Sequence, residues 1–288
     1  MVDRISGART CVVVAFACKM ALLAAICSPA EAADASPWDG GPHAAVRLIA
    51  ASSSQTAPGG ALRAGIEIRL GTGWKTYWRY AGDSGVPPRF RFDRSENVRD
   101  VAVLFPAPHG FNDESGESIG YKGGVILPLH VVPRDSAKPV LLRLDIDYAI
   151  CSNLCIPVTG KAELQLPGDS EMDAALAASE ARVPKPVALG AGGPLSIRAI
   201  HREDGGAHPR MIVDVAAPPD AKVQLFAEGP TPDWALPIPS PVAGAPAGLQ
   251  RFAFDLDGLP PGASPNGATL RLTAATDDAA IEVATTIK

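Results

Sequence analysis

The strongest constraint on the fold is an alternation of apolar and polar side chains in residues 140–150. Apolar residues occupy one parity, and Arg143, Asp145 and Asp147 lie on the other. This period of two is typical of a β-strand with one buried and one exposed face. Residues 161–166 alternate in the same way, so two strands with a short connection are predicted. The apolar residues of the first run are Val140, Leu142, Leu144, Ile146, Tyr148 and Ile150.

Similar alternation recurs along most of the chain. Residues 43–51, 62–70, 101–105 and 125–132 each predict a strand upstream of residue 140. Downstream of residue 194, strands are predicted at 195–200, 211–217, 223–227, 252–256, 270–272 and 281–287. Short strands separated by turn signals, in a chain with 28 glycines and 28 prolines, favour an all-β fold built as a sandwich.

The strand runs fall into two groups, which predict two domains. Residues 36–168 are expected to form a β-sandwich that carries a cysteine pair, and residues 195–288 a second, small β domain. Between them, residues 169–194 combine a short helix with a linker rich in proline and glycine. The sequence from Ser170 to Asp173 resembles a capping box, which predicts a helix that continues to about Arg182.

Residues 1–32 have the organisation of a secretory signal peptide. Arg4 and Arg9 precede a largely apolar stretch, and residues 30–32 read Ala-Glu-Ala, a small-residue cleavage site. Cleavage there removes three of the five cysteines and leaves Cys151 and Cys155, an even number that suits an oxidising compartment. We therefore expect an exported protein with no membrane span after cleavage.

Composition and motifs exclude several functional classes. The formal net charge is −5 and the chain has no long basic run, which argues against binding to nucleic acid. Hydrophobic residues make up 47% of the chain, enough for a sizeable core. No nucleotide-binding glycine loop, serine–histidine–aspartate order or zinc-ligand spacing is present. We expect no cofactor and no metal site, and we interpret His109 and His130 as structural.

Cys151 and Cys155 lie in the connection between the two strands predicted around them. On a straight strand their Cα atoms would be about 13 Å apart, whereas a disulfide requires about 7 Å or less. The segment must therefore turn if the two are to bond, and Ser152 and Asn153 are favourable turn residues. Such a bond closes a very short loop and stabilises the fold by only about 2 kcal/mol in the chain-entropy model.

The residues alone leave three roles open for this pair. It can be a structural disulfide, a Cu(I) or Zn(II) clip, since thiolates are soft ligands, or a redox-active disulfide, since exposed short-loop pairs are easily reduced. A structural zinc site needs four ligands, and no histidine or third cysteine lies close in sequence. The nearest basic residue is Lys161, so the pair is better suited to receive attack from a partner's thiolate than to attack.

Three stretches in a fixed order carry a family resemblance. Residues 147–157 read Asp-Tyr-Ala-Ile-Cys, three further residues, then Cys-Ile-Pro. They follow a stretch rich in glycine and aromatic residues at 73–85 and a polar stretch at 111–122. Together these resemble the periplasmic N-terminal domain of the DsbD family of thiol:disulfide interchange proteins, and especially its copper-sensitivity-suppressor branch, ScsB. The resemblance covers about residues 40–168.

The resemblance implies an immunoglobulin-like sandwich and a thiol–disulfide relay in the periplasm. In this family the domain passes electrons from a membrane thiol reductase to soluble thioredoxin-like oxidoreductases, in exchange chemistry similar to that of a protein-disulfide reductase. The second cysteine bonds the partner, so Cys155 would be the contact sulfur and Cys151 the resolving one. Because this chain carries neither the transmembrane nor the thioredoxin-like domain of full DsbD proteins, we expect a separate electron source.

Proteins of this family act in cytochrome c biogenesis and in copper tolerance. Two alternatives to the relay function therefore remain. One is a copper-tolerance protein that binds Cu(I) through the cysteine pair, and the other is a non-catalytic immunoglobulin-like interaction module with a structural disulfide. The resemblance also implies a cap over the sulfurs at residues 111–122. In the family an aromatic residue follows the acidic pair of the cap, whereas Ser115 follows it here. The candidate cap or neighbouring residues are Tyr77, Phe111, Asp113, Glu114 and Tyr121.

Overall fold

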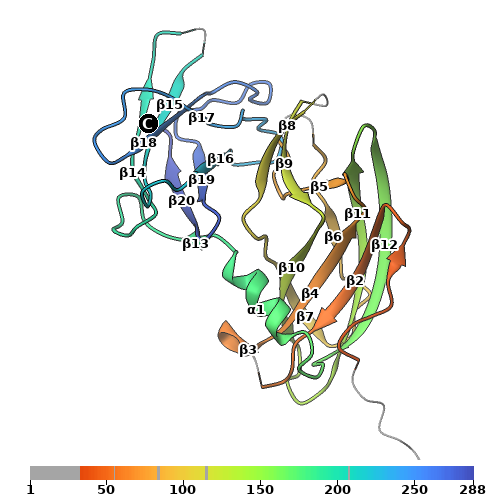
Figure 1. Ribbon diagram of the computed structural model, residues 1–288. Coiled ribbons are helices and arrows are strands. Elements are labelled where there is room, and N and C mark those ends of the chain that lie inside the picture. Colours follow the sequence, from red (N-terminus) through yellow and green to blue (C-terminus); the bar gives the residue numbers. More distant parts are fainter. Residues whose placement is uncertain (1–32, 55, 83–84, 114–115, 207) are drawn as a thin grey trace, which may run out of the picture. The chain divides into compact units, whose positions relative to one another are not determined.

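The computed structural model describes residues 33–54, 56–82, 85–113, 116–206 and 208–288, which are shown in Figure 1. The predicted signal peptide, residues 1–32, lies outside the described residues. Strands dominate the described chain and α1 is its one α-helix, which confirms the prediction of an all-β fold. No helix in this described part has both the length and the apolar character needed to cross a membrane.

Two six-stranded sheets form the N-terminal sheet pair. The first has the strand order β1-β2-β4-β10-β7, with β3 also paired to β4, and the second has the order β12-β11-β5-β9-β8, with β6 paired to β11. The first sheet contains β1 (Asp39–Gly40), β2 (Ala44–Ala50), β3 (Thr56–Ala57), β4 (Ala61–Leu70), β7 (Val98–Val103) and β10 (Gly124–Pro133). The second contains β5 (Lys75–Tyr77), β6 (Arg89–Arg91), β8 (His109–Asp113), β9 (Gly116–Lys122), β11 (Val140–Cys151) and β12 (Cys155–Leu166).

The alternation along β11 builds the core between these two sheets. Its even-numbered residues from Val140 to Ile150 are all buried, whereas Arg143, Asp145 and Asp147 on the other face remain partly exposed. The buried residues form one cluster with apolar side chains of β2, β4 and β10. Each such side chain contributes about 1.5–3 kcal/mol by burial. The two sheets therefore form the predicted β-sandwich, which the family resemblance implies to be immunoglobulin-like.

The stretch expected to be a capping loop has a different structure. Residues 111–122 fall mostly within a β-hairpin of β8 and β9, in which Phe111 pairs with Ser118 and His109 with Gly120. Both strands contain glycines, which interrupt the alternation of apolar and polar residues that indicates a strand. The hairpin is therefore not evident from the sequence. Because β9 also pairs with β5, this hairpin extends the same sheet that contains β11 and β12.

The helix forms where the sequence predicts it, but not through a capping box. α1 (Asp173–Ala181) follows Met172 at the N-cap, and no side chain caps its first turn. The Asp173 carboxylate instead accepts hydrogen bonds from the Ser52 backbone amide at 2.9 Å and from the Ser52 hydroxyl at 2.7 Å. This tertiary contact fixes the start of the helix against the first sheet. A short 3₁₀ helix, η1 (Pro58–Gly60), precedes β4.

Two four-stranded sheets form the C-terminal sheet pair, with orders β13-β20-β19-β16 and β14-β15-β18-β17. β13 lies within the expected linker and pairs in parallel with β20, so part of that linker is a strand. Residues Ala32–Lys288 form one compact unit, and the predicted domain boundaries stay a prediction. The strands are β13 (Lys185–Pro186), β14 (Ser196–Glu203), β15 (Arg210–Ala216), β16 (Gln224–Glu228), β17 (Ser240–Pro241), β18 (Gln250–Asp255), β19 (Thr269–Ala275) and β20 (Ala280–Thr286).

Candidate functional site

The two cysteines face each other at the end of the long hairpin formed by β11 and β12. Cys151 is the last residue of β11 and Cys155 the first of β12, and they are register partners bonded by a disulfide with a Cα–Cα distance of 4.1 Å. Three residues connect them, and the Ser152 hydroxyl accepts a hydrogen bond from the Asn153 amide at 2.6 Å. The predicted turn at Ser152 and Asn153 is therefore confirmed.

Strand parity places this disulfide on the outer face of its sheet. Cys151 has the same parity as Asp145 and Asp147, and opposite parity to the core residues of β11. Because successive side chains of a strand point to opposite faces, the sulfurs point away from the sandwich core. A disulfide in this position does not join the two sheets, which is what a staple of the sandwich would do.

The two sulfurs differ sharply in exposure. Cys151 is 0% exposed and packs in a small buried cluster with Tyr77, Ala81 and Ala149. Cys155 is exposed, and its Sγ lies 3.4 Å from the Tyr77 hydroxyl oxygen. Since a disulfide sulfur carries no proton, the hydroxyl is the donor in this contact. Tyr77 thus touches both cysteines, shielding one and hydrogen-bonding the other.

Lys75 is a neighbour of the sulfurs that the sequence did not indicate. In the pairing of β5 with β11 it is the register partner of Cys151, so both side chains leave the same face of the sheet. Lys75 is buried, and its Nζ donates to the Ser118 hydroxyl of β9 at 2.9 Å. In the sequence, the only indication of its position was that Lys75 lies two residues before Tyr77 and so faces the same side of a strand. The pairing of β5 with β11 was not evident, because it joins segments far apart in sequence.

Phe111 covers the same face from β8. Its ring contacts two ammonium groups, with Lys122 Nζ at 4.5 Å and Lys75 Nζ at 5.9 Å from the ring centroid. Cation–π contacts of this kind contribute about 0.5–1 kcal/mol at exposed sites. The structure thus brings Phe111 to the face that carries the disulfide. The side chain of Asp113 and the whole of Glu114, the two predicted acidic neighbours, lie outside the described residues.

The residue that precedes the exposed sulfur is apolar and open to solvent. Leu154, which precedes Cys155 in the connecting turn, is 70% exposed, and Val86 is 57% exposed. Among the described residues these are two of the few large apolar side chains left open to solvent. Exposed apolar groups next to a reactive atom favour contact with another protein surface.

Comparison with known proteins agrees with this geometry. Residues 45–167 match the family model described as thiol:disulfide interchange protein DsbD, N-terminal. Over these residues, which are less than half of the chain, the sequence is similar to the DsbD N-terminal domain family. No curated protein sequence matches the chain.

A solved structure shares the fold. The N-terminal periplasmic domain of ScsB from Proteus mirabilis matches with a TM-score of 0.68 and 21% sequence identity, over 88% of this chain and 98% of that chain. Because 88% of this chain is covered, the shared fold extends beyond the DsbD N-terminal domain at residues 45–167. The chain is therefore built around a thiol:disulfide interchange domain with a disulfide at its hairpin end.

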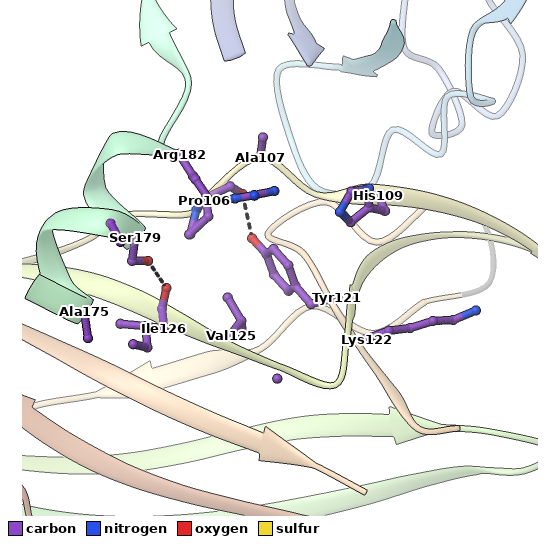
Figure 2. A pocket seen from close by; sticks show the side chains of 12 residues that line it. Pro106, Ala107, His109, Tyr121, Lys122, Val125, Ile126, Ala175, Ser179 and Arg182 are labelled. Carbon is purple, nitrogen blue, oxygen red and sulfur yellow. Dashed lines mark hydrogen bonds between the residues drawn. The ribbon is translucent and has the colours of Figure 1, made fainter. Parts of the chain in front are cut away.

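Tyr121 is not brought to the sulfurs of the DsbD N-terminal domain. It shares its parity in β9 with the buried Ile119, and its hydroxyl donates to the Pro106 carbonyl at 2.8 Å (Figure 2). Burial raises the pKa of Tyr121 well above its ordinary value, and nearby Arg79 and Arg182 only partly oppose this. Tyr121 thus faces the core. In the sequence, its spacing of two residues from the apolar Ile119 was the feature that could have indicated this.

Tyr121 also lines a hollow of about 430 Å³ behind the β8–β9 hairpin. Figure 2 shows Arg182 and His109 at this hollow, with α1 on one side, where the Ser179 hydroxyl donates to the Ile126 carbonyl at 2.6 Å. The hollow is separate from the disulfide, because neither cysteine lines it. Within the described ranges, no group of three or more histidine, cysteine, aspartate or glutamate side chains could hold a metal ion.

Proposed function

We propose that this protein is a periplasmic thiol–disulfide relay that passes electrons from a membrane thiol reductase to soluble thioredoxin-like oxidoreductases through Cys151 and Cys155. The observation that supports it most is the difference between the sulfurs. Cys155 is exposed at a hairpin tip and Cys151 is buried beneath Tyr77 and Ala81. A relay needs one sulfur that a partner can reach and a second that resolves the intermediate.

In the first half of the relay, a thiolate of the reductase attacks Cys155 Sγ. A bond forms between the two proteins, the Cys151–Cys155 bond breaks, and Cys151 leaves as a thiolate. The second thiol of the reductase then attacks its own sulfur in the mixed disulfide and releases Cys155. The reductase is oxidised to a disulfide and the cysteine pair is reduced by two electrons.

In the second half, the Cys155 thiolate attacks the disulfide of a soluble oxidoreductase. Cys151 then attacks Cys155 in the resulting mixed disulfide, which restores the original disulfide and leaves the oxidoreductase reduced. The Tyr77 hydroxyl supports this step, because its position 3.4 Å from Cys155 Sγ lets it donate to the thiolate. Leu154 supplies an apolar contact for a partner beside the reacting sulfur.

The assignment of the two sulfurs is tested by trapping. Removing the resolving cysteine should leave the mixed disulfide with no thiol to release it. We expect Cys151→Ser to accumulate a mixed disulfide through Cys155 with a periplasmic thioredoxin-like protein, and Cys155→Ser to accumulate none. Non-reducing gels of periplasmic extracts, followed by mass spectrometry of the shifted band, measure this.

Each alternative outcome of the trapping experiment has a clear meaning. A shifted band only in Cys155→Ser would reverse the two roles. A band in neither variant, with both proteins folded, would contradict the relay and favour a structural disulfide.

A further inference from the structure

The segment that shields Cys151 continues directly into the C-terminal sheet pair. Tyr77 and Ala81, which bury Cys151, are separated by Trp78, Arg79 and Tyr80. Each of these three residues contacts the C-terminal sheet pair or the segment that follows β16. The cover of the resolving sulfur is therefore held at one end by a part of the chain that contributes nothing to the disulfide itself.

Arg79 makes the strongest of these contacts. Its guanidinium donates to Glu228 of β16 through Nη2 at 2.7 Å and Nε at 3.1 Å, and it also pairs with Glu282 of β20. The side chains of Arg79 and Glu228 are only 23% and 12% exposed. A bidentate pair with this degree of burial holds its geometry far better than an exposed ion pair.

Tyr80 and Trp78 strengthen the attachment. The Tyr80 hydroxyl donates to the backbone carbonyls of Trp234 at 2.6 Å and Leu236 at 3.1 Å. The Trp78 ring packs against Phe226 of β16, with their centroids 5.8 Å apart. Three consecutive residues after Tyr77 are thus fixed by an ion pair, a hydrogen bond and an aromatic contact.

The β8–β9 hairpin, which carries Phe111 to the disulfide face, contacts the same strand β16. The Gly110 amide lies 3.4 Å from the side-chain oxygen of Gln224 in β16. A Cβ at Gly110 would lie 3.6 Å from both Ile238 and Phe226, an ordinary van der Waals distance, so the hairpin backbone faces these two side chains. β16 and the segment after it therefore contact both the segment that shields Cys151 and the hairpin that carries Phe111.

We propose that the C-terminal sheet pair is a clamp that keeps Cys151 covered, so that partner thiolates attack Cys155 alone, with Arg79 as its main positioning residue. This inference rests on the proposed relay and gives the C-terminal sheet pair a role in it. Attack on Cys155 breaks the Cys151–Cys155 bond, oxidises the partner sulfur and releases Cys151 as a thiolate. Attack on Cys151 instead would form the mixed disulfide at a buried sulfur and release Cys155, the contact cysteine, as the thiolate.

The test measures how readily each thiol reacts in the reduced protein. Iodoacetamide forms a carbon–sulfur bond with a thiolate and releases iodide, and peptide mass spectrometry quantifies the label at Cys151 and Cys155 separately. The test variant is Arg79→Gln. The matched control is Arg251→Gln, which removes a similar bidentate pair with Asp214, 22% and 5% exposed, between β18 and β15 of the C-terminal sheet pair.

In Arg79→Gln we expect labelling of Cys151 to rise about tenfold or more, because breaking a partly buried ion pair lowers the cost of local opening. Labelling of Cys155 should change by less than about twofold, since that sulfur is already exposed. Arg251→Gln should lower the melting temperature without changing either rate. If Arg79→Gln does not fold, Tyr80→Phe removes one hydroxyl from the same segment and should raise Cys151 labelling in the same direction.

Unchanged labelling of Cys151 in both Arg79→Gln and Tyr80→Phe would overturn the clamp, as would an equal rise in Arg251→Gln, which would indicate general loosening. The measurement uses no partner protein, so it is independent of the trapping experiment. A failed trap with selective labelling of Cys155 would contradict the relay, but it would still support a cover over Cys151 that Arg79 holds in place.

Discussion

At the scale of single residues, Tyr77 connects the two cysteines. Its ring helps to bury Cys151, and its hydroxyl donates a hydrogen bond to Cys155 Sγ at 3.4 Å. The sequence predicted Tyr77 as a neighbour of the pair only through the family resemblance. It did not predict Lys75, because the pairing of Lys75 with Cys151 depends on how distant strands align.

The Tyr77 hydroxyl gives a prediction at this scale. Tyr77→Phe keeps the ring that covers Cys151 and removes only the donor to Cys155. Alkylation of Cys155 in the reduced protein at neutral pH should slow about fivefold, because a hydrogen bond to a charged group is lost. Stopped samples analysed by peptide mass spectrometry give this rate. Tyr148→Phe, which changes a buried residue on the opposite face of the same sheet, is the control and should leave it unchanged.

At the scale of elements, we expect the β11–β12 hairpin to fold without its disulfide. The two strands are paired without a bulge from Val140 and Leu166 to the cysteines, and the even-numbered residues of β11 anchor them in the core. Alternation alone predicted these strands, because one face of each strand meets the core. It failed for the β8–β9 hairpin, where glycines interrupt the pattern and the outer face is partly covered.

A double substitution tests the independence of the hairpin. Cys151→Ala with Cys155→Ala should leave the protein folded and cost about 2 kcal/mol, since the disulfide closes only a short loop. We expect the melting temperature to fall by about 4–8 °C. Circular dichroism during thermal unfolding measures this. Loss of the folded state at room temperature would show that the disulfide is a structural staple.

At the scale of the whole molecule, two sheet pairs meet around the segment that follows β5. Periodicity predicted both groups of strands, and the family resemblance predicted the immunoglobulin-like sandwich. Neither indicated that Arg79 would pair with Glu228 and Glu282, or that Tyr80 would bond the carbonyls of Trp234 and Leu236. Contacts between residues so far apart in sequence depend on the packing of complete sheets, which local patterns do not encode.

The central claim is that the Cys151–Cys155 disulfide is a redox centre, and its reduction potential tests this most directly. The folded protein is equilibrated with glutathione and dithiothreitol buffers of known potential, and the fraction reduced is measured by mass spectrometry after alkylation. An exposed pair that closes a short loop should have a potential above about −300 mV, within reach of cellular thiol partners. A value below about −300 mV would place the bond among structural disulfides and contradict the relay.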